Sequence, residues 1–210
     1  GTGIVNTTAG TTTVTINGSG GNIGGGGTVT VYNLTLGGSG TQTLQSATTA
    51  NNDVSVGTGK TLSLNNQNLT VSGGDLTTTS TAIITCSGTT GTTTVNGTAA
   101  TGIGGGAGAI TFCNLTIGGT VPIASAITVN NDMTNNGTFN NNSGTVTFDS
   151  TNTSVFAGSG TPAIQFNNFT SIIPNKILSF TASKTIRIDG VFTAAGSLGN
   201  RINIRSTTGT

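Results

Sequence analysis

The sequence predicts an all-β protein that coils into a parallel β-helix with degenerate turns of roughly 27 residues. Three observations lead to this prediction. Strand-favouring residues are abundant, with 47 Thr among the 210 residues, whereas the strong helix former Glu is absent. Gly and Asn, which number 35 and 24, are frequent enough to supply many bends. Finally, segments of the chain repeat one another at whole multiples of one interval, which is the predicted turn.

The longest internal repeat matches residues 10–38 with residues 91–119. Within it, Asn33 corresponds to Asn114, and Asn168 lies in a third, shorter copy further along the chain. The interval from Asn33 to Asn114 is three times a unit of roughly 27 residues, and the interval from Asn114 to Asn168 is twice that unit. One turn of a coil with three short strands takes roughly 20–30 residues. The two intervals therefore predict three whole turns and two whole turns.

The first predicted pair of strands surrounds Asn33 in the segment VYNLTL. Side chains of a strand alternate between its two faces, but the apolar alternation slips by one residue at Asn33, Asn114 and Asn168. A corner at each Asn would let the apolar side chains on both sides point inward, and Asn tolerates the left-handed backbone that such a corner needs. We therefore expect structural corners at these three positions. The expected inward neighbours are Val31, Leu34, Phe112, Leu115, Phe166 and Phe169.

Further strands follow the same alternation along the chain. Each has apolar residues two positions apart, which is typical of a strand with one buried face. In chain order these stretches are residues 62–64 and 69–71 on either side of the corner NNQN, then residues 146–148, 186–188 and 202–204.

Cys86 and Cys113 are separated by one copy of the same repeat unit. A separation of one turn places them side by side, either as a disulfide or as two stacked, buried thiols. Two cysteines are too few for a disulfide scaffold or a zinc site.

The motifs FCNLTI, ITVNND (127–132) and SGTVTF (143–148) resemble the repeats of parallel β-helix surface and adhesin-like proteins of bacteria. The resemblance implies a non-enzymatic structural or adhesive protein: a surface stalk, an adhesin or a filament subunit, extracellular or on the cell surface. Residues 1–210 then form a single β-solenoid domain, which we expect to be a segment of a longer chain or a fibre subunit that self-associates end to end. A cell-surface or glycan ligand is compatible with this prediction, but the sequence does not identify one.

The chain lacks the residues that most catalytic sites use. There is no His and no Glu, and the phosphate-binding lysine motif is absent from the Gly-rich run at 20–27. We predict no catalytic residue, cofactor or metal ion. Asp53 and Asp132 occupy matching places in the motif NND, either as a stacked acidic pair or as corner residues that accept backbone N–H bonds.

Charge is distributed unevenly along the chain. Residues 1–175 carry one Lys and four Asp, a formal charge of −3, whereas residues 176–210 have a formal charge of +4. The five basic residues are not interleaved with aromatics, so we interpret them as a solvated surface rather than a nucleic-acid site. They are Lys176, Lys184, Arg187, Arg201 and Arg205. No apolar run reaches the ~20 residues of a membrane span.

Three alternatives remain open at this point. The same composition permits a β-sandwich filament subunit that donates a strand such as residues 11–16 to its neighbour. A carbohydrate-binding or polysaccharide-degrading β-helix is the functional alternative, although Tyr32 is the only Tyr and Trp is absent. Ice binding would need Thr-x-Thr at every turn of one flat face, and the threonine segments look scattered.

Overall fold

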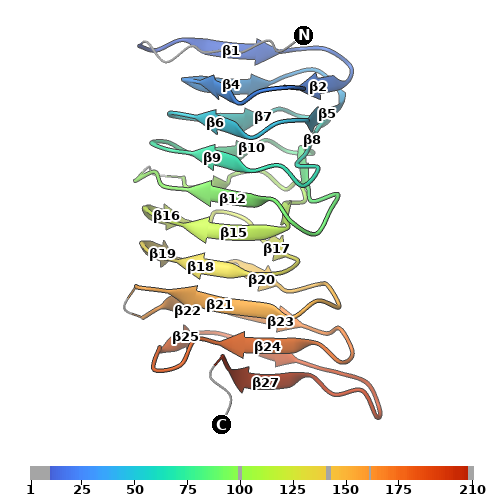
Figure 1. Ribbon diagram of the computed structural model, residues 1–210, viewed down its shortest axis with the longest axis vertical. Coiled ribbons are helices and arrows are strands. Elements are labelled where there is room, and N and C mark those ends of the chain that lie inside the picture. Colours follow the sequence, from blue (N-terminus) through green and yellow to red (C-terminus); the bar gives the residue numbers. More distant parts are fainter. Residues whose placement is uncertain (1–9, 99–100, 141–142, 161, 208–210) are drawn as a thin grey trace.

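The computed structural model describes residues 10–98, 101–140, 143–160 and 162–207. These residues form a parallel β-helix of about nine turns, stacked along one axis from β1 to β27, and they contain no helix (Figure 1). The predicted fold class is confirmed. With a rise of ~4.8 Å per turn, the stack is a rod about 40 Å long.

Each turn contributes one strand to each of three faces of the rod. The first face contains β1 (Thr13–Ile16), β4 (Asn33–Leu36), β7 (Val54–Val56), β10 (Leu76–Thr78), β13 (Ile103–Gly104), β16 (Thr120–Pro122), β19 (Thr138–Asn140), β22 (Ile164–Phe166) and β25 (Ile186–Ile188). The second contains β2 (Gly21–Ile23), β5 (Gly40–Leu44), β8 (Lys60–Ser63), β11 (Ile83–Thr85), β14 (Thr111–Phe112), β17 (Ile127–Val129), β20 (Thr145–Thr147), β23 (Asn168–Ser171) and β26 (Phe192–Ala194). The third contains β3 (Val29–Val31), β6 (Thr48–Ala50), β9 (Leu69–Val71), β12 (Thr92–Val95), β15 (Asn114–Ile117), β18 (Met133–Asn135), β21 (Ser154–Gly158), β24 (Ile177–Phe180) and β27 (Asn203–Ser206).

The three faces differ in continuity. The third face is one unbroken sheet of nine strands from β3 to β27. The second face divides into a four-stranded sheet ending at β11 and a five-stranded sheet beginning at β14, with a single bridge between Ile84 and Ile110. The first face divides after β13 and again after β19. All strand pairings in these sheets are parallel, so the alternative of a β-sandwich, which is built from antiparallel sheets, is wrong.

The predicted turn length, roughly 27 residues on the coil estimate, is wrong, because the average turn has about 22 residues. Paired residues are 17 positions apart between β14 and β17 and 27 positions apart between β10 and β13. The error arose because the repeated segments lie on different faces. Asn33 is in β4 and Asn114 is in β15, eleven strands later, which is three turns and two further strands. The sequence interval therefore did not span a whole number of turns.

The core is a column of inward-pointing side chains that runs along the axis. Most strands show the pattern of one partly exposed residue between two buried ones, as alternation requires. The first half of the column is filled by Leu, Val and Ile, and the second half contains a cluster of Phe rings. The clustered rings are Phe139, Phe148, Phe156, Phe166, Phe169 and Phe180.

Outward-pointing threonines are more ordered than the sequence suggested. On the third face they form one column, with successive members in register on adjacent strands. This column is Thr30, Thr49, Thr70, Thr94, Thr116 and Thr134. The residue two positions before each of these threonines is not always Thr: it is Asn68, Thr92 and Asn114 in three consecutive turns. The Thr-x-Thr pattern that ice binding would need is therefore not present at every turn.

Candidate functional site

Asn33, Asn114 and Asn168 each occupy the first residue of a strand: β4, β15 and β23. These strands lie on three different faces, so the rod carries one of these residues at each of its three corners. The bend itself falls one residue earlier in each copy, at Tyr32, Cys113 and Asn167. The inward neighbours are all buried, with at most 1% of each residue exposed: Val31, Leu34, Phe112, Leu115, Phe166 and Phe169.

The side-chain oxygen of each of these asparagines accepts a backbone N–H from the next turn. The bonds run from Asp53 N to Asn33 Oδ1 (3.1 Å), from Asp132 N to Asn114 Oδ1 (3.2 Å) and from Val191 N to Asn168 Oδ1 (2.8 Å). The carbonyl group of the bend residue still accepts a backbone N–H from the next turn, as from Asn52 N to Tyr32 O (2.8 Å), but the N–H that follows finds its acceptor in the Asn side chain. The Asn side chain therefore joins neighbouring turns where the backbone ladder is interrupted.

The left-handed backbone that was expected at these three positions is not found. Among the described residues other than glycine, positive φ angles occur at Asn65 (46°), Asn66 (59°), Asn175 (61°) and Ser183 (60°). Two of these belong to the NNQN corner, where Asn supplies the left-handed conformation. Asn33, Asn114 and Asn168 instead act through their side-chain hydrogen bonds.

Asn114→Ala is expected to lower the unfolding free energy by ~2 kcal/mol. The substitution removes the acceptor of Asp132 N–H and the Nδ2 bonds to Thr90 O (2.9 Å) and Gly91 O (3.1 Å). Asn168→Ala, which removes the bond from Val191 N–H, is the matched comparison and should cost about half as much. Urea denaturation measures both, and an equal loss in the two variants would contradict this explanation.

Asp53 and Asp132 do not form the acidic pair that was one interpretation of the NND motif. Asp53 directly precedes β7 on the first face, whereas Asp132 directly precedes β18 on the third. Asp53 Oδ1 accepts the N–H of Asp75 (2.9 Å), and Asp132 Oδ1 accepts the N–H of Val155 (2.8 Å). Both are corner residues that bind the backbone of the following turn, which was the other interpretation.

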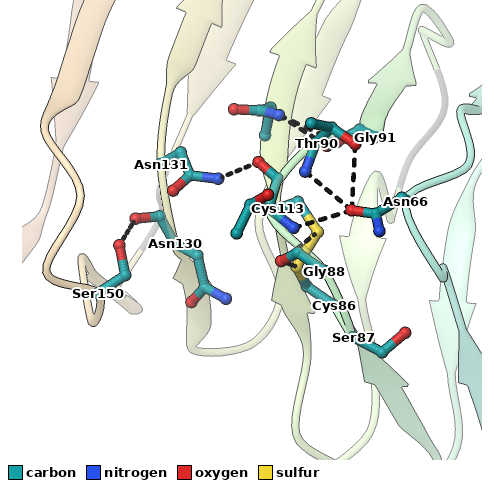
Figure 2. Close-up of a disulfide and its surroundings, with 12 residues drawn as sticks. Asn66, Cys86, Ser87, Gly88, Thr90, Gly91, Cys113, Asn130, Asn131 and Ser150 are labelled. Atoms are coloured by element: carbon teal, nitrogen blue, oxygen red, sulfur yellow. Dashed lines mark hydrogen bonds between the residues drawn. A yellow bond between two sulfur atoms is a disulfide. The ribbon is translucent and has the colours of Figure 1, made fainter.

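Cys86 and Cys113 form a disulfide, with their Cα atoms 5.2 Å apart (Figure 2). The bond joins the chain just after β11 to the chain just after β14, at the break between the two sheets of the second face. The carbonyl oxygen of Gly88 lies 2.9 Å from Sγ of Cys86 and 3.4 Å from Sγ of Cys113. The disulfide therefore adds a covalent connection at a break in the hydrogen-bond ladder.

The loop that follows Cys86 is held by amide side chains from the preceding turn and from the second turn after it (Figure 2). Asn66 Oδ1 accepts the N–H groups of Thr89 (2.8 Å) and Thr90 (3.0 Å), and Asn131 Nδ2 donates to Thr89 O (2.8 Å). This loop borders a shallow groove of about 540 Å³. We call it the amide groove; its lining is Asn68, Thr89, Thr90, Gly91, Thr92, Asn114, Asn131, Asp132, Asn152 and Thr153.

The chemistry of the amide groove is hydrogen bonding. Its lining presents amides, hydroxyls and one carboxylate, that of Asp132, so it lacks the pair of titratable groups that acid–base catalysis uses. No aromatic ring lines it. In the described part of the chain, no three His, Cys, Asp or Glu residues cluster as metal ligands would. The groove can accept a neutral polar molecule through amide and hydroxyl contacts.

Two lysines that the sequence analysis did not single out as a pair are fully buried. Lys60, in β8, donates through Nζ to the carbonyls of Gly18 and Ser39, which belong to the two preceding turns. Lys176, just before β24, donates to Asn130 O (3.3 Å) and Ser150 Oγ (3.4 Å), again in the two preceding turns. Each side chain thus lies along a corner and ties three turns together. The interpretation of Lys176 as a solvated surface residue is wrong.

Burial lowers the pKa of Lys176 from 10.5 to about 8, and the carboxylates of Asp132 and then Asp149 partly offset this effect. The unfolded chain, with the ordinary pKa, binds more protons between pH 8 and 10.5 than the folded chain does. Burial of the protonated lysine therefore lowers the unfolding free energy by its full amount below pH 8. This destabilisation decreases as the pH rises and is lost by pH 10.5.

The unfolding free energy should consequently rise with pH across the window from 8 to 10.5, and Lys176→Met should remove that rise. Urea denaturation at half-unit pH intervals measures the slope. The exposed Lys184→Met variant is the control, because it should retain the slope of the unmodified protein. Identical slopes in Lys176→Met and the unmodified chain would contradict the expectation.

The described residues contain no apolar helix of membrane-spanning length. No family model, curated protein or solved structure matches this chain. The likeness to bacterial surface proteins therefore rests on the sequence motifs, and the established result is a parallel β-solenoid with about 22 residues per turn.

Proposed function

We propose that this chain is a non-enzymatic structural protein that acts outside the cell as the shaft of a stalk, an adhesin or a filament. The observation that carries the proposal is the nine-stranded parallel sheet of the third face, which extends from β3 in the first turn to β27 in the last. A sheet of this kind holds the two ends of a rod at a fixed separation. The corner amides and buried lysines support the same role, because their hydrogen bonds join successive turns.

The disulfide supports the extracellular location. Disulfides persist in oxidising compartments and are rare in the reducing cytosol. Cys86 and Cys113 are the only cysteines of the chain, and both are used in the bond. A surface rich in Thr and Asn, with 5% charged residues in the whole chain, is compatible with a protein that works in a variable external medium.

Immunogold labelling and protease accessibility on intact producing cells test the location. We expect label outside the cell, and non-reducing peptide mapping should recover the Cys86–Cys113 peptide pair. Recovery of the protein from the cell interior with both thiols free would refute the proposal.

The amide groove favours a second candidate function, weak binding of a neutral carbohydrate. Its four Asn side chains and the Asp132 carboxylate are groups that form hydrogen bonds with sugar hydroxyls. Saturation-transfer NMR with neutral oligosaccharides tests this candidate. Transfer that is present in the unmodified chain and lost in Asn152→Ala would support it, whereas no transfer to any oligosaccharide would refute it.

A further inference from the structure

Three asparagines of the chain precede a glycine: Asn17, Asn96 and Asn136. In this dipeptide the backbone nitrogen of the glycine can attack the side-chain amide, because glycine has no side chain to hinder the approach. Asn17 lies in the first described turn. Asn96 directly follows β12 and Asn136 directly follows β18, so both lie inside the stack, on the corner that leads from the third face to the first. The same dipeptide therefore occurs twice on one corner, in different surroundings.

Asn136 and Gly137 have the groups for this attack free of other bonds. Asn136 is exposed, and its side-chain amide has no hydrogen-bond partner among the described residues. The backbone N–H of Asn136 is held by Ile117 O (2.8 Å), whereas no group in the described part of the chain accepts the N–H of Gly137. Neither the attacking nitrogen nor the amide that it would attack has to break a hydrogen bond within the protein.

A small hollow beside Gly137 gives this peptide room to rotate. Its volume is about 80 Å³, and it lies at the break in the first face, where no strand pairing joins β19 to β22. Its lining is Asn135, Gly137, Thr138, Phe139, Pro162 and Gln165. Asn135 is buried, and its Oδ1 has no hydrogen-bond partner in the part of the chain that the structure describes. The hollow is therefore polar and has room for water, the second reactant of deamidation.

Asn96 lacks this room, although its dipeptide is the same. Gly97 is buried, whereas Gly137 is half-buried. The carbonyl oxygen of Gly97 lies 2.1 Å from the position that a Cβ atom on Gly119 would take, so the next turn packs directly against it. The carbonyl oxygen of Gly137 lies 3.0 Å from the corresponding position on Gly160. Rotation of the peptide is therefore more restricted at Asn96 than at Asn136.

We propose that Asn136 is a site of spontaneous deamidation and that in the folded protein it converts before Asn96. The nitrogen of Gly137 attacks Cγ of Asn136, and the new C–N bond closes a cyclic imide. The side-chain nitrogen leaves as ammonia, together with the proton from the nitrogen of Gly137. Water then adds to one of the two ring carbonyls and breaks its C–N bond, which gives aspartate or isoaspartate. Both products carry a new carboxylate, and isoaspartate also lengthens the backbone between β18 and β19 by a methylene group.

Incubation of the oxidised 210-residue chain at mildly alkaline pH, followed by peptide mapping with tandem mass spectrometry, tests this order. In the folded chain, Asn136 should convert at least about tenfold faster than Asn96 or Asn135, because tight packing restricts the first and a larger following residue hinders the second. Asn135 is the neighbouring control, since it is buried and its Nδ2 donates to Ala163 O (2.8 Å). In guanidinium, where packing is lost, Asn136 and Asn96 should convert at similar rates.

Asn136→Gln is the matched variant, because a glutamine side chain is too long to close the same ring. The mass change at this position should disappear, and the slower change at Asn96 should persist. A mass change that survives the substitution would come from another residue and would overturn the proposal. So would equal rates at Asn136 and Asn96 in the folded chain, or an Asn136 that reacts only when the chain is unfolded. None of these results bears on whether the protein lies outside the cell, which the labelling experiment decides separately.

Discussion

Phe156→Ala is expected to lower the unfolding free energy by about 3–5 kcal/mol, the range for removing a fully buried aromatic ring. Phe156 is 0% exposed and lies at the centre of the aromatic cluster. Its ring centroid is 4.6 Å from those of Phe148 and Phe180 and 5.8 Å from that of Phe169. These rings come from two consecutive turns, and buried Met133 of the turn before lies in register with Phe156, so the cavity would weaken contacts both above and below β21.

Guanidinium denaturation measures the loss for Phe156→Ala. Phe192→Ala is the matched control, because Phe192 is 44% exposed and contacts the cluster through Phe169 (5.3 Å). It should lose about 1 kcal/mol. A similar loss in the two variants would show that the cluster is not the centre of the core's stability.

Replacing both cysteines with serine is expected to lower the unfolding free energy by about 3.5 kcal/mol, since the bond closes a loop of about 27 residues in the unfolded chain. Within the folded protein, the loss of the disulfide should weaken the structure only near the bond. The second face has only the bridge between Ile84 and Ile110 at this level, so β11 and β14 lose their main additional connection.

Hydrogen exchange followed by mass spectrometry checks this second expectation. In the Cys86→Ser/Cys113→Ser variant, protection should fall most in residues 83–95 and 110–117, and least in residues 29–36. The reduced unmodified chain should show the same pattern. Uniform loss of protection along the rod would contradict a local role for the disulfide.

The sequence was sufficient to predict the coil and the inward positions, because both depend on a local signal. Alternation of apolar residues fixes which side chains point inward within a strand, and the slip at Asn114 indicates a bend beside this residue, which the structure has at Cys113. The turn length depends on which strand of one turn pairs with which strand of the next. Corner loops of different lengths separate the strands, so a single interval such as the one from Asn33 to Asn114 cannot give this pairing.

The buried lysines show a different limit. A lysine is normally exposed, and only the surrounding carbonyl groups make its burial tolerable. These acceptors come from turns 21 to 46 residues away, so no local pattern indicates them. One signal was available in the sequence: KTLSL at residues 60–64 and KILSF at residues 176–180 place a lysine at the same position of two similar segments, where β8 and β24 begin. The shared pattern links two residues with the same burial and the same role.

The unequal continuity of the three faces gives the rod a preferred direction of bending. On the third face, backbone hydrogen bonds connect every strand to the next along the whole axis of the rod. The first and second faces are divided. Single bridges connect β11 with β14 and β13 with the end of β16, the disulfide adds a covalent link at the first of these junctions, and no strand pairing joins β19 to β22. A sideways load that stretches the third face works against nine hydrogen-bonded strands, whereas a load from the opposite side opens the junctions first. We therefore expect the rod to be stiffer against bending in one direction than in the other.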